Sequence, residues 1–192
     1  FPEQAANWDW MSGLIERAQR PVKVLNLFGY TGGATAALAQ AGAAVVHVDA
    51  AKNMVAQGRE NLALSGLEDK PVRWIVDDCR KFVEREIRRG NKYDGIIMDP
   101  PSYGRGPSGQ IWKLEDELYP FVSLCMNVLS DNPLFILINS YTTGLQPLVL
   151  YNILTKLTKN LGGRVDAQEV GLPVTRGGII LPCGASGRWQ KD

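Results

Sequence analysis

The sequence has few of the residues that build metal sites and disulfide frameworks. Its 192 residues include three cysteines and a single histidine, His47. The cysteines show no paired spacing and no Cys/His cluster surrounds His47, which argues against a disulfide-stapled fold and against a bound metal. Because His47 lies within an apolar strand pattern, we expect a packed core histidine rather than a general base.

Long apolar runs and a strong charge imbalance are also absent. No apolar stretch reaches the length of a membrane span and no signal-peptide pattern is found, so we expect a soluble cytoplasmic protein without a membrane partner. The formal net charge of +1 gives no indication of a nucleic-acid partner, since dedicated binders show a clearly basic balance. The first residue is Phe1 rather than Met, so we expect an N-terminal portion upstream of this sequence.

Composition and hydrophobic pattern indicate an α/β domain. With 45% hydrophobic and 21% charged residues and no internal repeat or linker, residues 1–192 are expected to form one domain with a substantial core. Apolar runs predict strands at 22–27, 44–48, 72–76, 93–98, 133–138, 164–170 and 178–182. The remaining periodic segments predict helices at 3–18, 34–41, 51–64, 79–89, 113–129 and 148–160. In segment 79–89 basic residues alternate with Glu84 and Glu86, which is typical of a solvated helix face.

The most informative motif is Asp99-Pro100-Pro101-Ser102-Tyr103, which directly follows the apolar run 93–98. Each proline fixes φ and removes a backbone donor, so this segment is stiff. Asp99 and Pro100 therefore present acceptors that can hold a substrate amine or the edge of a nucleobase. A plain Asp-Pro turn that closes a strand is the open alternative.

Three upstream strands also end in polar or glycine-rich segments. The first leads into Asn26-Leu27-Phe28-Gly29-Tyr30-Thr31-Gly32-Gly33, a strand-to-helix junction where backbone can approach a ligand closely. The second ends in Asp49, about 20 residues after Gly29, where nucleotide-binding α/β folds place the acid that accepts the ribose hydroxyls. The third ends in Asp77-Asp78-Cys79, where Asp78 can accept from an adenine amine while the Cys79 N–H meets a ring nitrogen.

These residues resemble the class I S-adenosylmethionine-dependent methyltransferases and, within them, the ribosomal RNA large-subunit methyltransferase I/K-like family. The resemblance rests on 26–33, Val48-Asp49-Ala50, Asp78-Cys79 and Met98-Asp99-Pro100-Pro101, and it extends through 138–142 and 181–185. It implies an α/β fold with a Rossmann-like, doubly wound, mostly parallel seven-stranded sheet and an antiparallel C-terminal strand. Segment 1–4 also resembles a family segment that lies near the cofactor.

The resemblance further implies a methyltransferase with S-adenosylmethionine as cofactor and S-adenosylhomocysteine as product. Its ribose is expected on Asp49, its adenine near Asp78 and its methyl group directed towards Asp99. The cofactor-binding residues expected are Asn26, Phe28, Gly29, Tyr30, Thr31, Gly32, Gly33, Asp49, Ala50, Asp78, Cys79 and Asp99. The catalytic residues expected are Asp99, Pro100, Pro101 and Tyr103.

The expected partner is ribosomal RNA, and a departure from the family bears on which atom is methylated. Relatives that methylate carbon 5 of cytosine carry a cysteine just after the fifth strand, because a thiolate must first add to the ring. This sequence has Asn139-Ser140-Tyr141 there, whereas its cysteines are Cys79, Cys125 and Cys183. Transfer to a nitrogen, which needs an in-line lone pair and good positioning, is therefore favoured over carbon 5.

Several alternatives stay open at this point. Tyr103 is either a stacking platform for a flat substrate or a surface ring, and Arg105, in the glycine-rich segment 102–109, either clamps a phosphate or belongs to a flexible solvent loop. A nicotinamide dehydrogenase would share the turn and the ribose acid, but its glycine spacing is not met. A methyltransferase for proteins or small molecules, or a nucleotide-binding domain without catalysis, fits the same fold. The pattern does not indicate an oligomeric state.

Overall fold

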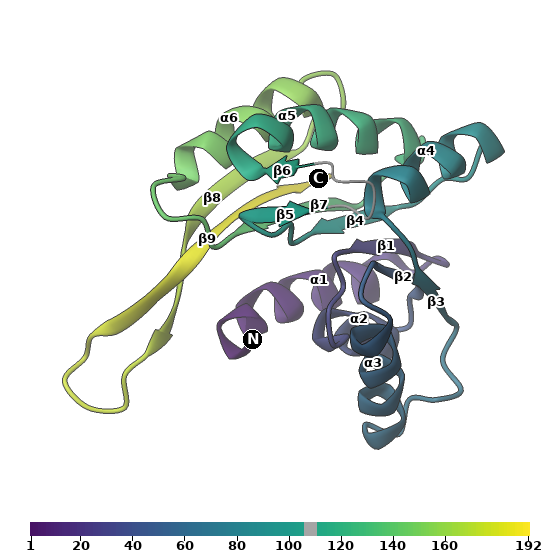
Figure 1. The fold of residues 1–192 in the computed structure, drawn as a ribbon, viewed down its shortest axis with the longest axis horizontal. Helices are drawn as coiled ribbons and strands as arrows, with labels where there is room; N and C mark the ends of the chain where they lie inside the picture. Colours follow the sequence, from purple (N-terminus) through teal and green to yellow (C-terminus); the bar gives the residue numbers. More distant parts are fainter. Residues whose placement is uncertain (106–110) are drawn as a thin grey trace.

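A seven-stranded sheet with the order β3-β2-β1-β4-β7-β9-β8 forms the centre of the computed structural model, which describes residues 1–105 and 111–192 (Figure 1). Its strands are β1 (Lys23–Leu27), β2 (Ala44–Asp49), β3 (Val72–Val76), β4 (Gly95–Met98), β7 (Phe135–Ser140), β8 (Arg164–Pro173) and β9 (Ile180–Gln190). The first five of these pair in parallel, and β9 runs antiparallel between β7 and β8. The expected Rossmann-like, mostly parallel sheet with an antiparallel C-terminal strand is thus confirmed.

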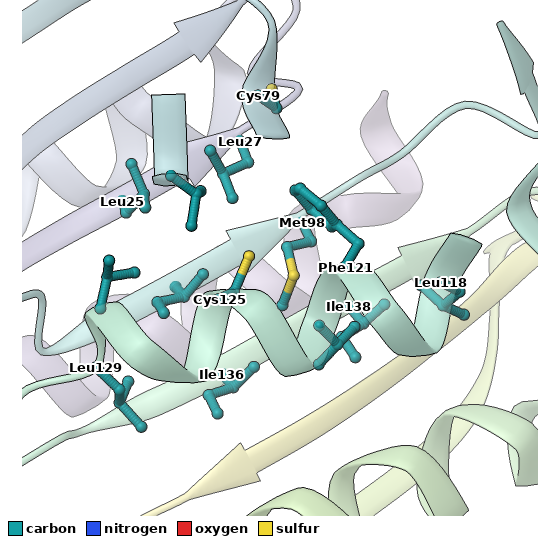
Figure 2. Packing of buried hydrophobic residues seen from close by; sticks show 14 of the residues in the cluster. Leu25, Leu27, Cys79, Met98, Leu118, Phe121, Cys125, Leu129, Ile136 and Ile138 are labelled. Atoms are coloured by element: carbon teal, nitrogen blue, oxygen red, sulfur yellow. The ribbon is translucent and has the colours of Figure 1, made fainter. Parts of the chain in front are cut away.

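Helices cover both faces of this sheet. One face carries α1 (Ala5–Ala18), α2 (Gly33–Gln40) and α3 (Lys52–Leu64), and the other carries α4 (Cys79–Arg89), α5 (Leu114–Cys125) and α6 (Pro147–Thr158) (Figure 1). Successive residues of β1 serve opposite faces, since Val24 joins the core with Met11 of α1 and Leu25 joins the core with Phe121 of α5. Figure 2 shows Leu25 and Phe121 within this second core. Burial on both faces explains why the central strands are continuous apolar runs.

The C-terminal hairpin is longer than the sequence predicts. Strands β8 and β9 extend beyond the helical layers as an arm (Figure 1). Residues 183–190 were not expected as strand, because Gly184 and Gly187 weaken a strand pattern. Each glycine instead allows a neighbouring residue to approach the backbone closely. A Cβ atom added at Gly184 would lie 2.5 Å from the Ser140 carbonyl oxygen, and one added at Gly187 would lie 2.7 Å from the Leu150 Cβ.

Two further expectations were wrong. The segment after the proline pair is not simply a loop, because β5 (Tyr103–Arg105) and β6 (Ile111–Lys113) form an antiparallel hairpin. Residues 106–109 of the expected loop lie outside the described residues. Helix α4 is not only a solvated face, since Glu86 is fully buried and accepts hydrogen bonds from Tyr93, Asn91 and Arg89. These hydrogen bonds outweigh the opposing effect of burial and lower the pKa of Glu86.

The strand order places a switch point at the centre of the sheet. β1 pairs with β2 on one side and with β4 on the other, so the chain winds outwards in both directions from this pair. Open α/β sheets bind ligands outside the carboxyl ends of the strands at such a point. The segments after β1, β2, β3 and β4 all lie on this rim.

Candidate functional site

The turn after β1 has an unusual backbone that is tied to the neighbouring strand ends by its own N–H groups. Phe28 and Tyr30 adopt left-handed φ values of 57° and 48°, on either side of Gly29. The Gly29 N–H donates to the Val48 carbonyl at 3.0 Å, which ties the turn to the end of β2. Gly29 also has no room for a side chain, because a Cβ would lie 2.4 Å from Cε1 of His47. The sequence predicts a close approach of the backbone at this turn, and in the structure the backbone closely approaches His47 in the protein's own core.

A buried polar chain supports this turn from below. The Asn26 amide donates to the Thr35 hydroxyl at 3.0 Å, and the same hydroxyl bonds Nδ1 of His47 at 2.9 Å. Burial lowers the pKa of His47 to about 4, so the imidazole is neutral at physiological pH. The expectation of a core histidine is confirmed by its full burial. Asn26, expected to bind the cofactor, has 2% of its surface exposed, and its side chain supports the turn rather than facing a ligand.

Asp49, at the end of β2, is held in a fixed orientation by the backbone. One carboxylate oxygen accepts from the Tyr30 N–H at 2.9 Å, and the other accepts from the Ala51 N–H at 2.8 Å. Each oxygen keeps a further lone pair, so the carboxylate can still accept two hydroxyl groups. Ala50 is exposed beside it. This arrangement suits the ribose role expected for Asp49.

The end of β3 contributes a helix cap and a buried thiol. Asp78 is the N-cap of α4 and accepts from the Lys81 N–H at 2.9 Å through one carboxylate oxygen. The Cys79 thiol accepts from the Phe28 N–H at 3.3 Å and is buried, and burial raises its pKa. Cys79 therefore links the first turn to the third strand. Only its backbone N–H, in the first turn of α4, is suited to a ligand.

The Asp-Pro-Pro segment forms a fixed ledge after β4. Asp99 is partly buried, and this desolvation raises its pKa to about 6, with the charge of Glu3 adding to the rise. Pro100 is buried, whereas Pro101 is exposed. The Pro101 carbonyl is not a free acceptor, because it takes the indole N–H of Trp112 at 2.7 Å. This hydrogen bond fixes the ledge to β6.

The ledge continues into an exposed ring and an open hollow. Tyr103, on β5, has 52% of its surface exposed. A hollow of about 510 Å³ lies beside it, lined by Ser102, Tyr103, Lys113, Glu115 and Asp116. Ser102 also accepts from the Thr142 hydroxyl at 2.7 Å, so the ledge is joined to the segment after β7. The backbone of Arg105 belongs to β5.

Sequence reasoning missed most of a group of residues at the same rim. Glu3 and Gln4, in a short 3₁₀ helix (Pro2–Gln4), both contact Tyr141, which follows β7. The Phe1 ring stacks on Tyr30 with ring centroids 5.9 Å apart. Only the likeness of segments 1–4 and 138–142 to the family signalled this region. The contacts join residues 137 and 138 positions apart, which no local pattern reveals.

No helix in the described parts of the chain is both long and apolar enough to cross a bilayer. Within residues 1–105 and 111–192, no group of three or more metal-ligating side chains is found.

The fold and the rim define a class I methyltransferase. An acid fixed after β2, an N-capping acid after β3 and a glycine turn after β1 are the donor and acceptor set that a nucleoside cofactor requires. The S-adenosylmethionine-dependent methyltransferase family matches residues 10–118, which is more than half of the sequence. The chain therefore belongs to this family, and its cofactor is S-adenosylmethionine.

Individual relatives agree with this assignment. A ribosomal RNA large subunit methyltransferase K/L from Shewanella baltica is 35% identical over 91 residues, which cover 47% of this chain and 12% of the relative. A ribosomal RNA large subunit methyltransferase I from Klebsiella pneumoniae is 37% identical over 82 residues, covering 42% of this chain and 20% of the relative. The crystal structure of a methyltransferase from Agrobacterium tumefaciens superposes with a TM-score of 0.93 and 39% identity, over 100% of this chain and 63% of that one. The chain thus spans only part of the length of each relative.

Proposed function

We propose that this chain transfers a methyl group from S-adenosylmethionine to a nitrogen atom of a base in ribosomal RNA. The observation that carries the proposal is the position of Asp99: a partly buried carboxylate on a stiff proline ledge, at the switch point beside the Asp49 turn. An acceptor in this position can hold an N–H group of a substrate while the lone pair of that nitrogen faces the cofactor.

We assign one set of residues to cofactor binding and another set to substrate binding. S-Adenosylmethionine supplies a methyl group activated by a sulfonium centre. We assign the ribose to Asp49, the adenine to Asp78 and the Cys79 N–H, and the remaining backbone contacts to 28–33 and Ala50. We assign the substrate to Asp99 and Pro100, with Pro101 acting through the rigidity of the ledge. At pH 7 Asp99 is mostly ionised, so it can accept a hydrogen bond and then a proton.

The absence of a suitably placed thiol supports nitrogen over carbon 5. Asn139 and Ser140, the last residues of β7, are buried and occupy the place of the cysteine in carbon-5 enzymes. Cys79 and Cys125 are buried in the core, and burial raises the pKa of both thiols. Cys183 lies on β9, where its thiol contacts the Leu181 carbonyl at 3.4 Å.

Ribosomal RNA is supported by the names of the relatives from Shewanella baltica and Klebsiella pneumoniae. The hollow beside Tyr103 is open enough for a base to reach the ledge, with the ring as a stacking surface. We further propose that residues 1–192 act as one methyltransferase domain, and that the protein works in the cytoplasm, where ribosomal RNA is modified. A protein or a small molecule is the alternative substrate.

Transfer of radiolabel tests the proposal. The chain is incubated with S-adenosylmethionine labelled in its methyl group and with a cell lysate, which is then divided between ribonuclease and protease treatment. We expect the labelled macromolecule to be lost with ribonuclease and kept with protease. Label that survives ribonuclease and disappears with protease would contradict an RNA substrate. Nucleoside analysis of the labelled RNA then distinguishes a methylated nitrogen from 5-methylcytosine.

A further inference from the structure

A second carboxylate, Glu3, lies at the same rim as Asp99. Its side chain has 8% of its surface exposed, an unusual burial for an acid, and it accepts from the Tyr141 hydroxyl at 2.8 Å. Strands β4 and β7 pair up to Met98 and Ile138, so the segments holding Asp99 and Tyr141 leave adjacent strands. Burial, the hydrogen bond to Glu3 and the charge of Asp99 all raise the pKa of the Tyr141 hydroxyl, and the charge of Glu3 adds to the raised pKa of Asp99.

Glu3 is fixed in place by the segment on which it lies. The Gln4 amide donates to the Tyr141 hydroxyl at 2.8 Å, and the Asn7 amide donates to the Gln4 side chain at 2.7 Å. Asn7 also donates to the Ser186 hydroxyl of β9 at 2.9 Å, and all of its surface is buried. The start of the chain is therefore bound to β7 and β9 by a polar network, which holds the Glu3 carboxylate towards the rim.

Aromatic rings place this segment between the cofactor turn and the ledge. Phe1 contacts Tyr30 of the glycine turn at a centroid distance of 5.9 Å and Tyr141 at 6.3 Å. Glu3 therefore lies near both the turn assigned to the cofactor and the Asp99 ledge. Burying an acid at this position costs free energy unless a partner compensates for it. One hydrogen bond from Tyr141 leaves most of the acceptor capacity of the carboxylate unused.

We propose that Glu3 and Asp99 form a pair of acceptors that selects an amino group as the methylated nucleophile, with Tyr141 positioning Glu3. This inference rests on the proposed function and narrows its substrate to a base with an exocyclic amine. Such an amine has two N–H groups, and two carboxylates can accept both while the lone pair points to the methyl group. A nucleophile with fewer hydrogens would leave one buried carboxylate unpaired, which discriminates strongly against it.

These residues account for every bond and proton in the methyl transfer. The amine nitrogen forms a bond to the methyl carbon as the carbon–sulfur bond breaks, and the electron pair of that bond stays on sulfur. The proton that the nitrogen then loses passes to Asp99. Glu3 keeps its hydrogen bond to the remaining N–H of the product, so its role is to orient the amine rather than to take the proton.

Sinefungin provides a test that needs no RNA substrate. This analogue carries a primary ammonium group where S-adenosylmethionine carries its methylated sulfonium, whereas S-adenosylhomocysteine has no group at that place. Isothermal titration calorimetry of the whole chain gives the dissociation constants of both ligands, and their ratio isolates the contribution of the ammonium group. We expect sinefungin to bind about tenfold more tightly, because the ammonium donates charge-assisted hydrogen bonds to the two acids.

Three variants locate the origin of this preference. Glu3→Gln and Asp99→Asn should each reduce the ratio by at least about threefold while the affinity for S-adenosylhomocysteine is kept. Tyr141→Phe, which removes only the hydroxyl that holds Glu3, should change the ratio in the same direction by a smaller factor. Glu16→Gln is the matched control, because it removes the same charge from an exposed position near the other end of α1 and should leave the ratio unchanged.

Two results would overturn the inference. One is equal affinity of the unchanged protein for the two ligands. The other is an equal loss of both affinities in Glu3→Gln, which would show that Glu3 contacts the amino-acid end that the ligands share. Thermal unfolding of each variant shows whether it folds, and Tyr141→Phe tests the same contact if Glu3→Gln does not. Failure of the unchanged protein to bind either ligand is a different outcome, since it would refute the proposed function itself.

Discussion

Replacing Asp49 with alanine tests the cofactor site most directly. The carboxylate accepts from the Tyr30 and Ala51 N–H groups and, in our assignment, from the ribose hydroxyls as well. Loss of a charged acceptor from a hydrogen bond costs about 1.5–3 kcal/mol. At about 1.4 kcal/mol per factor of ten, the dissociation constant of S-adenosylhomocysteine should rise by about 10- to 150-fold.

The fold should tolerate the replacement of Asp49, so the effect on ligand affinity can be measured apart from any effect on the free energy of unfolding. The Tyr30 and Ala51 N–H groups lie at the partly exposed rim, where water can replace the lost carboxylate, so the free energy of unfolding should fall by about 1 kcal/mol or less. Calorimetric titration measures the first effect and thermal unfolding without ligand measures the second. Asp69→Ala, in an exposed turn, is the matched control. Unchanged affinity in Asp49→Ala would refute our assignment of the ribose to this acid.

Four other predictions concern the substrate side and the support of the turn. Asp99→Asn should reduce turnover far more than affinity for S-adenosylhomocysteine, and a larger loss of affinity would contradict the role of Asp99 on the substrate side. Because burial raises the pKa of Asp99 to about 6, turnover of the unchanged protein should fall as the pH drops through 6, where the carboxyl group becomes protonated and can no longer accept a proton. A pH profile of the unchanged protein without that fall would count against Asp99 as the proton acceptor. Gly29→Ala should destabilise the fold by about 1–3 kcal/mol in denaturant titration, because its methyl group would lie 2.4 Å from Cε1 of His47, and the loss should be smaller in a His47→Ala background. Cys183→Ser should keep full turnover in the labelling assay, and a loss of several orders of magnitude would revive carbon-5 chemistry.

The central sheet was predictable because each of its strands is marked by the hydrophobic pattern of its own residues. Strands buried on both faces must be apolar throughout, so β1, β2 and β7 appear in the sequence as short hydrophobic runs. The β9 strand was predicted only in part, because its glycines are there for close contacts with Ser140 and Leu150, which lie far away in sequence. The β5–β6 hairpin was missed because each of its strands is only three residues long and β5 contains Gly104.

The acids of the rim were predictable for a related reason. Asp49 ends β2, Asp78 lies two residues after β3 and Asp99 directly follows β4, and parallel strands bring their carboxyl ends to one edge. The hydrogen bonds and the pKa values of these acids were not predictable. One oxygen of Asp78 is used in capping α4, and the raised pKa of Asp99 depends on burial by segments from elsewhere in the chain. The sequence also gave no sign that Asn26 lies beneath the turn.

By itself, the amino-acid sequence determined the fold class, the family and the row of polar groups at the strand ends, because hydrophobic period and strand-end chemistry are local properties. Only the tertiary structure brought Glu3 to Tyr141 beside the ledge, since hydrogen bonds across more than 130 residues depend on how the layers pack. Packing likewise decided that His47 is neutral and that Glu86 is buried, because desolvation is a property of the assembled core.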